Sequence, residues 1–429
     1  MLLCLFYTTI KFFLYIRIER FTQYVFFIIS FLYLINIFVD DYKRFLKKEF
    51  ILPYLMILFA IISILASCNV GLIGIRSIIM FIINFIAITI DDPHDSDYIK
   101  TFEYIVLLIL IISNVHTILC LIFCVTDILQ ITSLGVYMEN RLHGFAYFNG
   151  TGELALLGIG SIVYFFDKAN YNINNKYFIC NIVFTLLHIV VLILTQNRLA
   201  LYGLILCVIV YFIIKMCKER QQIDLKKYFK YIVFMFAFIA VIYIVLLNFN
   251  IFKIRKFSLL SNERVDIWVA FLSVFIRENM LFGLGPDKAV QLFKYTLGNN
   301  SLQSYINYFN DYNLAYKIRS ISNFFEPFMP HNEFIRHMIM FGLVGTALII
   351  IYVINIFYKL IKVYRNDDRF CSLISYLSVF YIVFPLISGC VENTFSFTNS
   401  PRYFINFVFF FVVGYVNKMY DELSIVANH

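Results

Sequence analysis

Long apolar segments alternate with short polar connections along most of the chain. A helix needs roughly 20 apolar residues to cross the hydrocarbon core of a membrane, and by that measure the pattern predicts about twelve spanning helices. We place them at approximately residues 2–16, 21–39, 51–68, 71–90, 102–125, 150–166, 177–195, 199–216, 229–248, 333–358, 372–390 and 403–418. The sequence therefore predicts an all-α polytopic membrane protein.

The longest polar interruption is a loop over residues 249–332. No Pro-, Gly- or Ser-rich linker divides the chain, so residues 1–429 are expected to form a single integral membrane domain. Within the loop, apolar side chains recur at helical spacing and predict an amphipathic helix: Val265, Trp268, Leu272, Phe275 and Ile276. The run Gly283-Leu284-Gly285-Pro286-Asp287 then predicts a tight turn, because glycine supplies positive φ and proline stops a helix.

Composition and charge fix the class and the predicted orientation. Hydrophobic residues make up 61% of the chain and charged residues 14%, which excludes an ordinary soluble globular domain. Basic residues gather in alternate connections: Lys43, Arg44, Lys47 and Lys48; Lys215, Lys218, Arg220, Lys226 and Lys227; Lys359, Lys362, Arg365 and Arg369. Since basic loops stay in the cytoplasm, both termini are predicted inside and the 249–332 loop outside. The net charge of +8 comes largely from these connections, so we expect no nucleic-acid partner.

Arginines mark the predicted outer face. They are Arg76, Arg141, Arg198, Arg264, Arg336 and Arg402. An arginine keeps its charge and binds phosphate through two parallel hydrogen bonds, so such a set suits a diphosphate group. The alternative interpretation is that each arginine snorkels at a helix end and pairs with a lipid headgroup or a loop carboxylate.

His331-Asn332-Glu333 stands where the chain re-enters the membrane after the large loop. A helix start gathers unpaired backbone N–H groups and favours an anion. Histidine there is a candidate general base near neutral pH, and Glu333 is the competing candidate. The alternative is that His331 caps the helix or lies at the interface without taking part in chemistry.

Other polar residues lie inside the predicted spans. Glu153, His116 and His188 are functional candidates by position, although we favour hydrogen bonding between helices for the two histidines. The nine cysteines include no C-x-x-C pair and no His/Cys cluster at metal-ligand spacing, so we expect neither a metal nor another cofactor.

Four motifs in order resemble the O-antigen ligase and polymerase family of bacterial membrane glycosyltransferases. They are Arg141-Leu142-His143-Gly144-Phe145 with Asn149, Thr195-Gln196-Asn197-Arg198, Arg264 and Trp268 followed by Gly283-Leu284-Gly285, and His331-Asn332-Glu333-Phe334 with Gly342-Leu343-Val344-Gly345. Asn197 and Leu199 depart from the serine and glycine usual in that family. Each motif alone is weak, whereas their order and the one large outer loop strengthen the resemblance.

The resemblance implies that Arg141, Arg198 and Arg264 bind the diphosphate of a lipid-linked glycan and that His331 acts in catalysis without a metal. Trp268, Gly283, Gly285 and Asn332 are then expected to shape the loop that meets the substrate. Arg76, Arg336 and Arg402 join this site only through the predicted topology. The implied partners are an undecaprenyl-diphosphate-linked oligosaccharide and membrane lipids, with a chain-length regulator and a flippase as candidate protein partners.

The leading hypothesis is therefore an inverting polymerase of polysaccharide repeat units, for O-antigen or capsule, in the bacterial cytoplasmic membrane with its site facing outward. A ligase that moves the finished glycan to lipid A-core or another terminal acceptor shares these motifs. A flippase, with the cations lining a translocation path, is the alternative from another class, and a non-catalytic scaffold is the third.

Overall fold

The computed structural model of the chain describes residues 50–67, 98–131, 137, 138, 141–144, 147–169, 175–219, 280–287, 332–391 and 403–426. It also describes single positions at 35, 39, 71, 74, 75, 77–79, 81, 82, 84, 268, 272 and 276. The helices predicted at 2–16 and 229–248, nearly all of the helix predicted at 21–39, and most of the 249–332 loop lie outside these residues.

The described part is helical, as predicted, except for one short β-ribbon. The helices are α3 (Ile51–Ala66), α5 (Tyr98–Ile128), α6 (Tyr147–Lys168), α7 (Asn175–Thr195), α8 (Arg198–Glu219), α14 (Glu333–Arg365), α15 (Arg369–Ser378), the π-helical η3 (Val379–Val383), α16 (Phe384–Val391) and α17 (Tyr403–Val426). Strands β1 (Tyr137–Met138) and β2 (Arg141–Leu142) pair antiparallel. Five described segments are long and apolar enough to cross a membrane: 98–128, 177–195, 199–218, 333–365 and 369–390.

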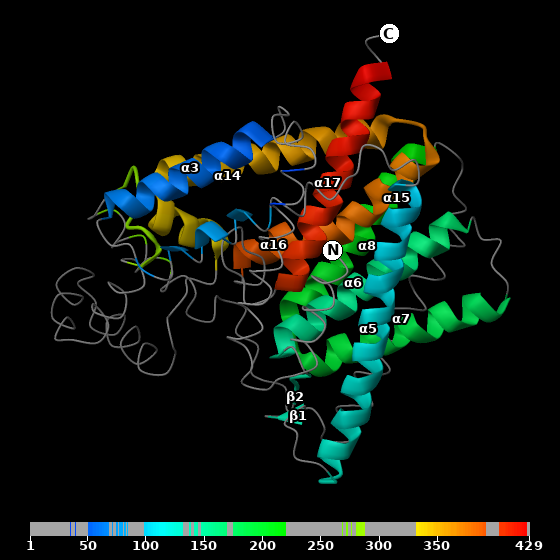
Figure 1. Cartoon of the computed structure of the whole chain (residues 1–429). Helices are drawn as coiled ribbons and strands as arrows, with labels where there is room; N and C mark the ends of the chain where they lie inside the picture. Colours follow the sequence, from blue (N-terminus) through cyan, green and yellow to red (C-terminus); the bar gives the residue numbers. More distant parts are fainter. Residues whose placement is uncertain are drawn as a thin grey trace.

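Helix α6 occupies the middle of the bundle (Figure 1) and packs against α5, α7, α8 and α15. Residues 150–162 of this helix are all buried. Glycine allows this close packing, because a Cβ on Gly158 would lie 2.5 Å from Ser113 Oγ and one on Gly160 would lie 2.7 Å from Phe380 Cβ. A helix enclosed on every side by protein can carry polar groups that a lipid-facing helix cannot.

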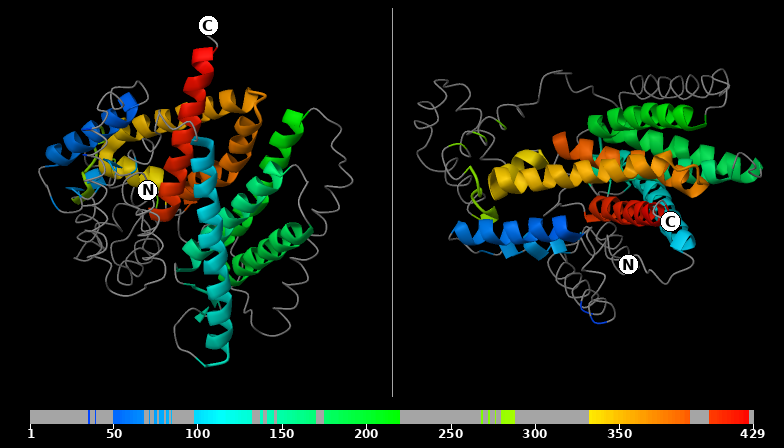
Figure 2. Two further views of the ribbon diagram at one scale, coloured as in Figure 1. Left: turned by 45° about the vertical axis from the view of Figure 1, so that its right-hand side comes forward. Right: turned by 90° about the horizontal axis from the view of Figure 1, so that it is seen from above.

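Helix α14 contains a sharp kink that the sequence did not predict. Gly342 has φ 72° and ψ −173°, which divides α14 into a short first segment and a long arm that ends at Arg365. The long arm lies alongside α3 in both Figure 1 and Figure 2. The predicted uniform span at 333–358 is therefore interrupted, and its helix continues beyond the predicted end.

The two ends of the bundle differ in their charged residues. We call the end where α6, α8 and α14 begin and α16 finishes the arginine end, because Arg141 lies there. At the opposite end, here the lysine end, Lys218 Nζ donates to Tyr364 O and Asn366 O, and Arg369 donates to Lys168 O. Tyr98 OH at the start of α5 also donates to Glu422 of α17, at 3.0 Å. Helix ends predicted to share one face thus lie together.

Candidate functional site

The described residues include part of the predicted site. Arg141, Trp268, Gly283, Gly285, Asn332, Glu333 and Arg336 are described, and Arg198 is described by its backbone position as the first residue of α8. The predictions for Arg76, Arg264, His331 and Arg402 lie outside the described residues.

Arg141 lies on β2 and is oriented by its own segment. Its Nε donates to His143 Nε2 at 3.2 Å, and the His143 carbonyl accepts from Thr151 Oγ1 of α6 at 2.9 Å. Tyr137 N on the partner strand donates to Asp127 Oδ2 at 3.1 Å, which joins the ribbon to the end of α5. Burial raises the pKa of the Tyr137 hydroxyl on this strand.

The turn between α7 and α8 packs on the same part of α6. Asn197 caps α8, because its Oδ1 accepts from Ala200 N at 3.2 Å. A Cβ on Gly152 of α6 would lie 3.1 Å from Asn197 Nδ2, so the two helix starts are in close contact. The backbone of Arg198 is thereby placed next to the start of α6, as is the Arg141 segment.

Helix α16 links α6 to α14 at the arginine end. Ser388 Oγ donates to Glu153 Oε1 of α6 at 3.3 Å, and Glu153 is completely buried. Two residues further on, Cys390 O accepts from Asn332 Nδ2 at 2.8 Å. Asn332 also caps α14, since its Oδ1 accepts from Ile335 N at 3.0 Å. The motif segments around Arg141, Arg198 and Asn332 therefore meet through α6 and α16.

Glu333 takes part in a buried ionic cluster on the first turns of α14. Its Oε2 lies 3.2 Å from Arg336 Nη1, and its Oε1 lies 2.9 Å from His337 Nδ1. The three side chains are at most 2% exposed, and the aromatic rings of Phe81 and Phe341 pack against His337. The sequence analysis missed His337, although carboxylate, arginine and histidine at positions i, i+3 and i+4 of one helix face signal such a cluster.

The predicted glycine turn is confirmed and has an unexpected neighbour. Gly283 and Gly285 have φ of 75° and 70°, as a turn of this kind requires. The turn pairs with the kink of α14 through four backbone hydrogen bonds: Leu284 N to Ile339 O (2.8 Å), Gly285 N to Met340 O (2.9 Å), Leu343 N to Met280 O (2.9 Å) and Val344 N to Leu281 O (3.4 Å). These bonds satisfy backbone groups that the kink removes from the helix ladder.

The glycine turn is also joined to the N-terminal helices. Ser63 Oγ of α3 lies within hydrogen-bond distance of Phe282 O and Met340 O. The carboxylate of Asp287 accepts from Gly71 N at 3.0 Å and from Gly74 N at 2.7 Å, where the helix predicted at 71–90 begins. A carboxylate is favourable at such a helix start because it satisfies backbone N–H groups there. The turn that opens the 288–331 stretch is therefore fixed on three sides.

Part of the amphipathic loop helix is described as well. Trp268, Leu272 and Ile276 are helical, as their spacing predicts. Trp268 packs against the hydrophobic core, whereas Ile276 is 59% exposed. Ile276 was predicted on the same apolar face as Trp268, so its exposure differs from the predicted pattern.

His188 makes the hydrogen bonds between helices that the sequence analysis favoured, whereas His116 contacts a residue of its own helix. His188 of α7 lies 2.8 Å from Thr117 Oγ1 and 2.9 Å from Asn114 Oδ1, both on α5. His116 Nε2 lies 3.2 Å from Cys120 Sγ. Among the described residues, no group of three or more His, Cys, Asp or Glu side chains could hold a metal ion.

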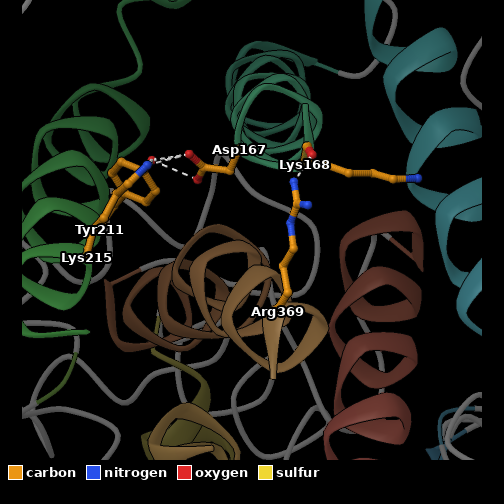
Figure 3. Close-up of polar contacts among 5 residues, drawn as sticks. All are labelled: Asp167, Lys168, Tyr211, Lys215 and Arg369. Carbon is orange, nitrogen blue, oxygen red and sulfur yellow. Dashed lines mark hydrogen bonds and ion pairs between the residues drawn. The ribbon is translucent and has the colours of Figure 1, made fainter. Parts of the chain in front are cut away.

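A second ionic cluster lies at the lysine end and is separate from the candidate site. Figure 3 shows Asp167 of α6 facing Tyr211 and Lys215 of α8, with Lys215 Nζ 2.6 Å from Asp167 Oδ1. Tyr211 OH donates to Asp167 Oδ2 at 2.8 Å, and all three side chains are buried. Because each polar group has a partner, we assign this cluster to the joining of α6 and α8.

The fold and its contacts define a helical, multi-pass membrane protein whose motif segments converge at one end of the bundle. Residues 183–350, from α7 to the long arm of α14, match a family model described as O-antigen ligase. Over these residues the match supports the resemblance to the O-antigen ligase and polymerase family that the motifs indicate. No curated protein matches the chain.

Proposed function

We propose that the protein is a polymerase of polysaccharide repeat units at the outer face of the bacterial cytoplasmic membrane. It would transfer a glycan from undecaprenyl diphosphate to a lipid-linked acceptor. The observation that carries the proposal is the convergence of the Arg141, Arg198 and Asn332 segments on α6 and α16, within a chain that matches the O-antigen ligase family. A diphosphate leaving group needs cations near a catalytic base, and these segments carry both residue types in the sequence: Arg141, Arg198 and His331.

We assign the general base to His331. It precedes Asn332, whose backbone and side chain are fixed by the start of α14 and by Cys390 of α16. Glu333 stays the alternative, but its carboxylate is already paired with Arg336 and His337. His331 would remove the proton from the acceptor hydroxyl as that oxygen attacks the anomeric carbon. Attack opposite the leaving group would invert this carbon.

We assign the binding of the departing diphosphate to Arg141, Arg198 and Arg264, and, on the predicted topology alone, to Arg76 and Arg402. Arg336 would have to give up its pair with Glu333 to bind phosphate, so it ranks behind them. Trp268, Gly283, Gly285 and Asn332 would shape the substrate loop. The mechanism uses no metal, because arginines can neutralise the charge that grows on the diphosphate.

A ligase is the second candidate, because the matching family model carries that description. Deletion of the gene separates the two activities. A polymerase mutant should accumulate undecaprenyl diphosphate carrying single repeat units, whereas a ligase mutant should accumulate long chains on the lipid that never reach their final acceptor. Lipid-linked units that remain on the cytoplasmic side would instead indicate a flippase. Normal glycans in the mutant would contradict every one of these functions.

The catalytic assignment has its own test. His331→Ala should abolish transfer while the protein still inserts and accumulates in the membrane, because the loss concerns one proton-accepting group. Arg198→Lys should also impair transfer, since lysine keeps the charge but loses the fork. Wild-type transfer by His331→Ala would exclude His331 as the base, and unchanged transfer by Arg198→Lys would support a snorkelling arginine.

A further inference from the structure

His143 lies between Arg141 and the start of α6 and receives a hydrogen bond from the arginine. The Arg141 Nε to His143 Nε2 distance is 3.2 Å. Arginine stays protonated in proteins, so its Nε–H is the donor and His143 Nε2 is the acceptor. This bond requires a neutral imidazole with its proton on Nδ1. His143 is 7% exposed, so protein rather than water surrounds the acceptor.

The backbone of His143 is fixed to α6. Thr151 Oγ1 donates to the His143 carbonyl at 2.9 Å. The next residue, Gly144, has φ of 62°, and a Cβ there would lie 2.3 Å from Thr151 Oγ1. Glycine is therefore needed both for the backbone conformation and for the close approach. The acceptor of the arginine is thus anchored to the central helix of the bundle.

We propose that His143 is a positioning residue that directs the Arg141 guanidinium toward the diphosphate of the lipid-linked donor. This inference rests on the proposed function of the protein. The Nε edge of Arg141 is bonded to His143, so a phosphate would be bound end-on by Nη1 and Nη2. Holding the fork in one orientation lowers the cost of aligning it when charge develops on the leaving group. Without the acceptor, Arg141 keeps its charge but loses its direction.

Three substitutions separate the acceptor from side-chain size and polarity. His143→Gln places an oxygen at the ε position and keeps an acceptor for Arg141. His143→Asn is also polar, but its oxygen ends one atom short, and His143→Leu has no acceptor. Each variant is made in the full chain, alone and combined with Arg141→Lys. Tyr104→Phe, at a 69% exposed position of α5, serves as the control for insertion and accumulation.

The assay uses purified protein in lipid and undecaprenyl diphosphate-linked repeat units extracted from the deletion strain. A hydrogen bond to a charged group is worth about tenfold in an equilibrium constant, so kcat should fall about tenfold in His143→Leu and His143→Asn. KM should change little, because the bond matters most when charge grows on the diphosphate. His143→Gln should recover most of the rate. In the Arg141→Lys background, His143→Leu should cause little further loss.

Several outcomes overturn the inference while the proposed function stands. The first is a wild-type kcat in His143→Leu. The second is an equal loss of kcat in His143→Gln and His143→Asn. The third is that the losses of His143→Leu and Arg141→Lys add. If His143→Leu fails to accumulate, the comparison of Gln with Asn decides, since both keep a polar side chain. Failure of the wild-type protein to transfer any glycan would instead remove the proposed function itself.

Discussion

At the scale of the residue, Gly342 is required for two independent reasons. Its φ of 72° is unfavourable for any residue with a Cβ, and a Cβ there would lie 2.1 Å from Leu281 O. Gly342→Ala should destabilise the protein by at least about 2 kcal/mol, because the glycine turn must move away from α14. Thermal unfolding of the purified protein in detergent measures this loss.

The matched control for that substitution is Val344→Ala. Val344 lies two residues further along α14 and its side chain is 39% exposed, so truncation removes little packing. Its Tm should stay close to that of the wild type. Equal Tm values for Gly342→Ala and the wild type would show that the turn and the kink tolerate separation.

Asn332 combines two contacts that substitution can separate. Its Oδ1 caps α14 and its Nδ2 donates to Cys390 O at 2.8 Å. Asn332→Asp keeps the cap but sets a carboxylate oxygen against the Cys390 carbonyl, so stability should fall by about 1–3 kcal/mol. Glycan transfer should fall further than stability alone explains, because residue 331 is the neighbour. Asn332→Ser also caps α14 but cannot reach α16. The difference between the Asp and Ser variants therefore measures how much of the lost stability comes from repulsion between the carboxylate and the Cys390 carbonyl.

At the scale of the element, the ion pair of Asp167 and Lys215 joins α6 to α8. Both side chains are 4% exposed, so Asp167→Asn leaves a lysine charge buried without its carboxylate. The expected cost is about 3–5 kcal/mol, measured as a lower Tm. Asp167→Asn combined with Lys215→Met should recover part of the loss, since no charge then remains buried.

The pair of Lys168 and Glu103 is the control for that experiment. Lys168 Nζ lies 2.5 Å from Glu103 Oε1, but the Lys168 side chain is 42% exposed and that of Glu103 is 20% exposed. A partly exposed pair contributes about 0–1 kcal/mol, so Glu103→Gln should change the Tm much less than Asp167→Asn. Equal effects would mean that burial does not govern the strength of the lysine-end contacts.

The helices could be predicted from the sequence more easily than their interruptions. The α7 helix was expected at 177–195 and runs over Asn175–Thr195, because a run of apolar residues is a local signal. The kink at Gly342 depends on bonds to residues 280–285, about sixty positions earlier in the chain, and local spacing carries no sign of them. The η3 segment inside the predicted span 372–390 was also missed.

The candidate site could be predicted by residue type but not by pairing. The sequence placed Arg141 and Glu333 at one end of the bundle from their positions beside apolar runs. The helical spacing of Glu333, Arg336 and His337 carried a signal for their cluster, but nothing in the sequence showed that Arg141 donates to His143, because that contact depends on side-chain direction.

At the scale of the whole molecule, lysines and tyrosines gather at the lysine end. Three lysine ammonium groups lie over tyrosine rings, and each distance runs from Nζ to the ring centroid: Lys359 over Tyr420 at 5.4 Å, Lys362 over Tyr358 at 5.7 Å, and Lys418 over Tyr98 at 3.9 Å. Lysine and tyrosine at helix ends are typical of a membrane interface, and an excess of lysine is typical of its cytoplasmic side. We therefore expect the lysine end to face the cytoplasm and the arginine end to face outward.

Cysteine labelling tests this orientation directly. Gln130 follows α5 at the arginine end and Asp367 precedes α15 at the lysine end, and both residues are exposed. In a chain whose nine native cysteines are replaced, and which still supports transfer, a charged maleimide should label Gln130→Cys in intact protoplasts. It should label Asp367→Cys only after permeabilisation, because a charged reagent cannot cross the hydrocarbon core. The reverse pattern would put Arg141 and Asn332 on the cytoplasmic side. The proposed diphosphate site would then face the cytoplasm, where the repeat units are made, and this result would contradict a transferase that acts at the outer face.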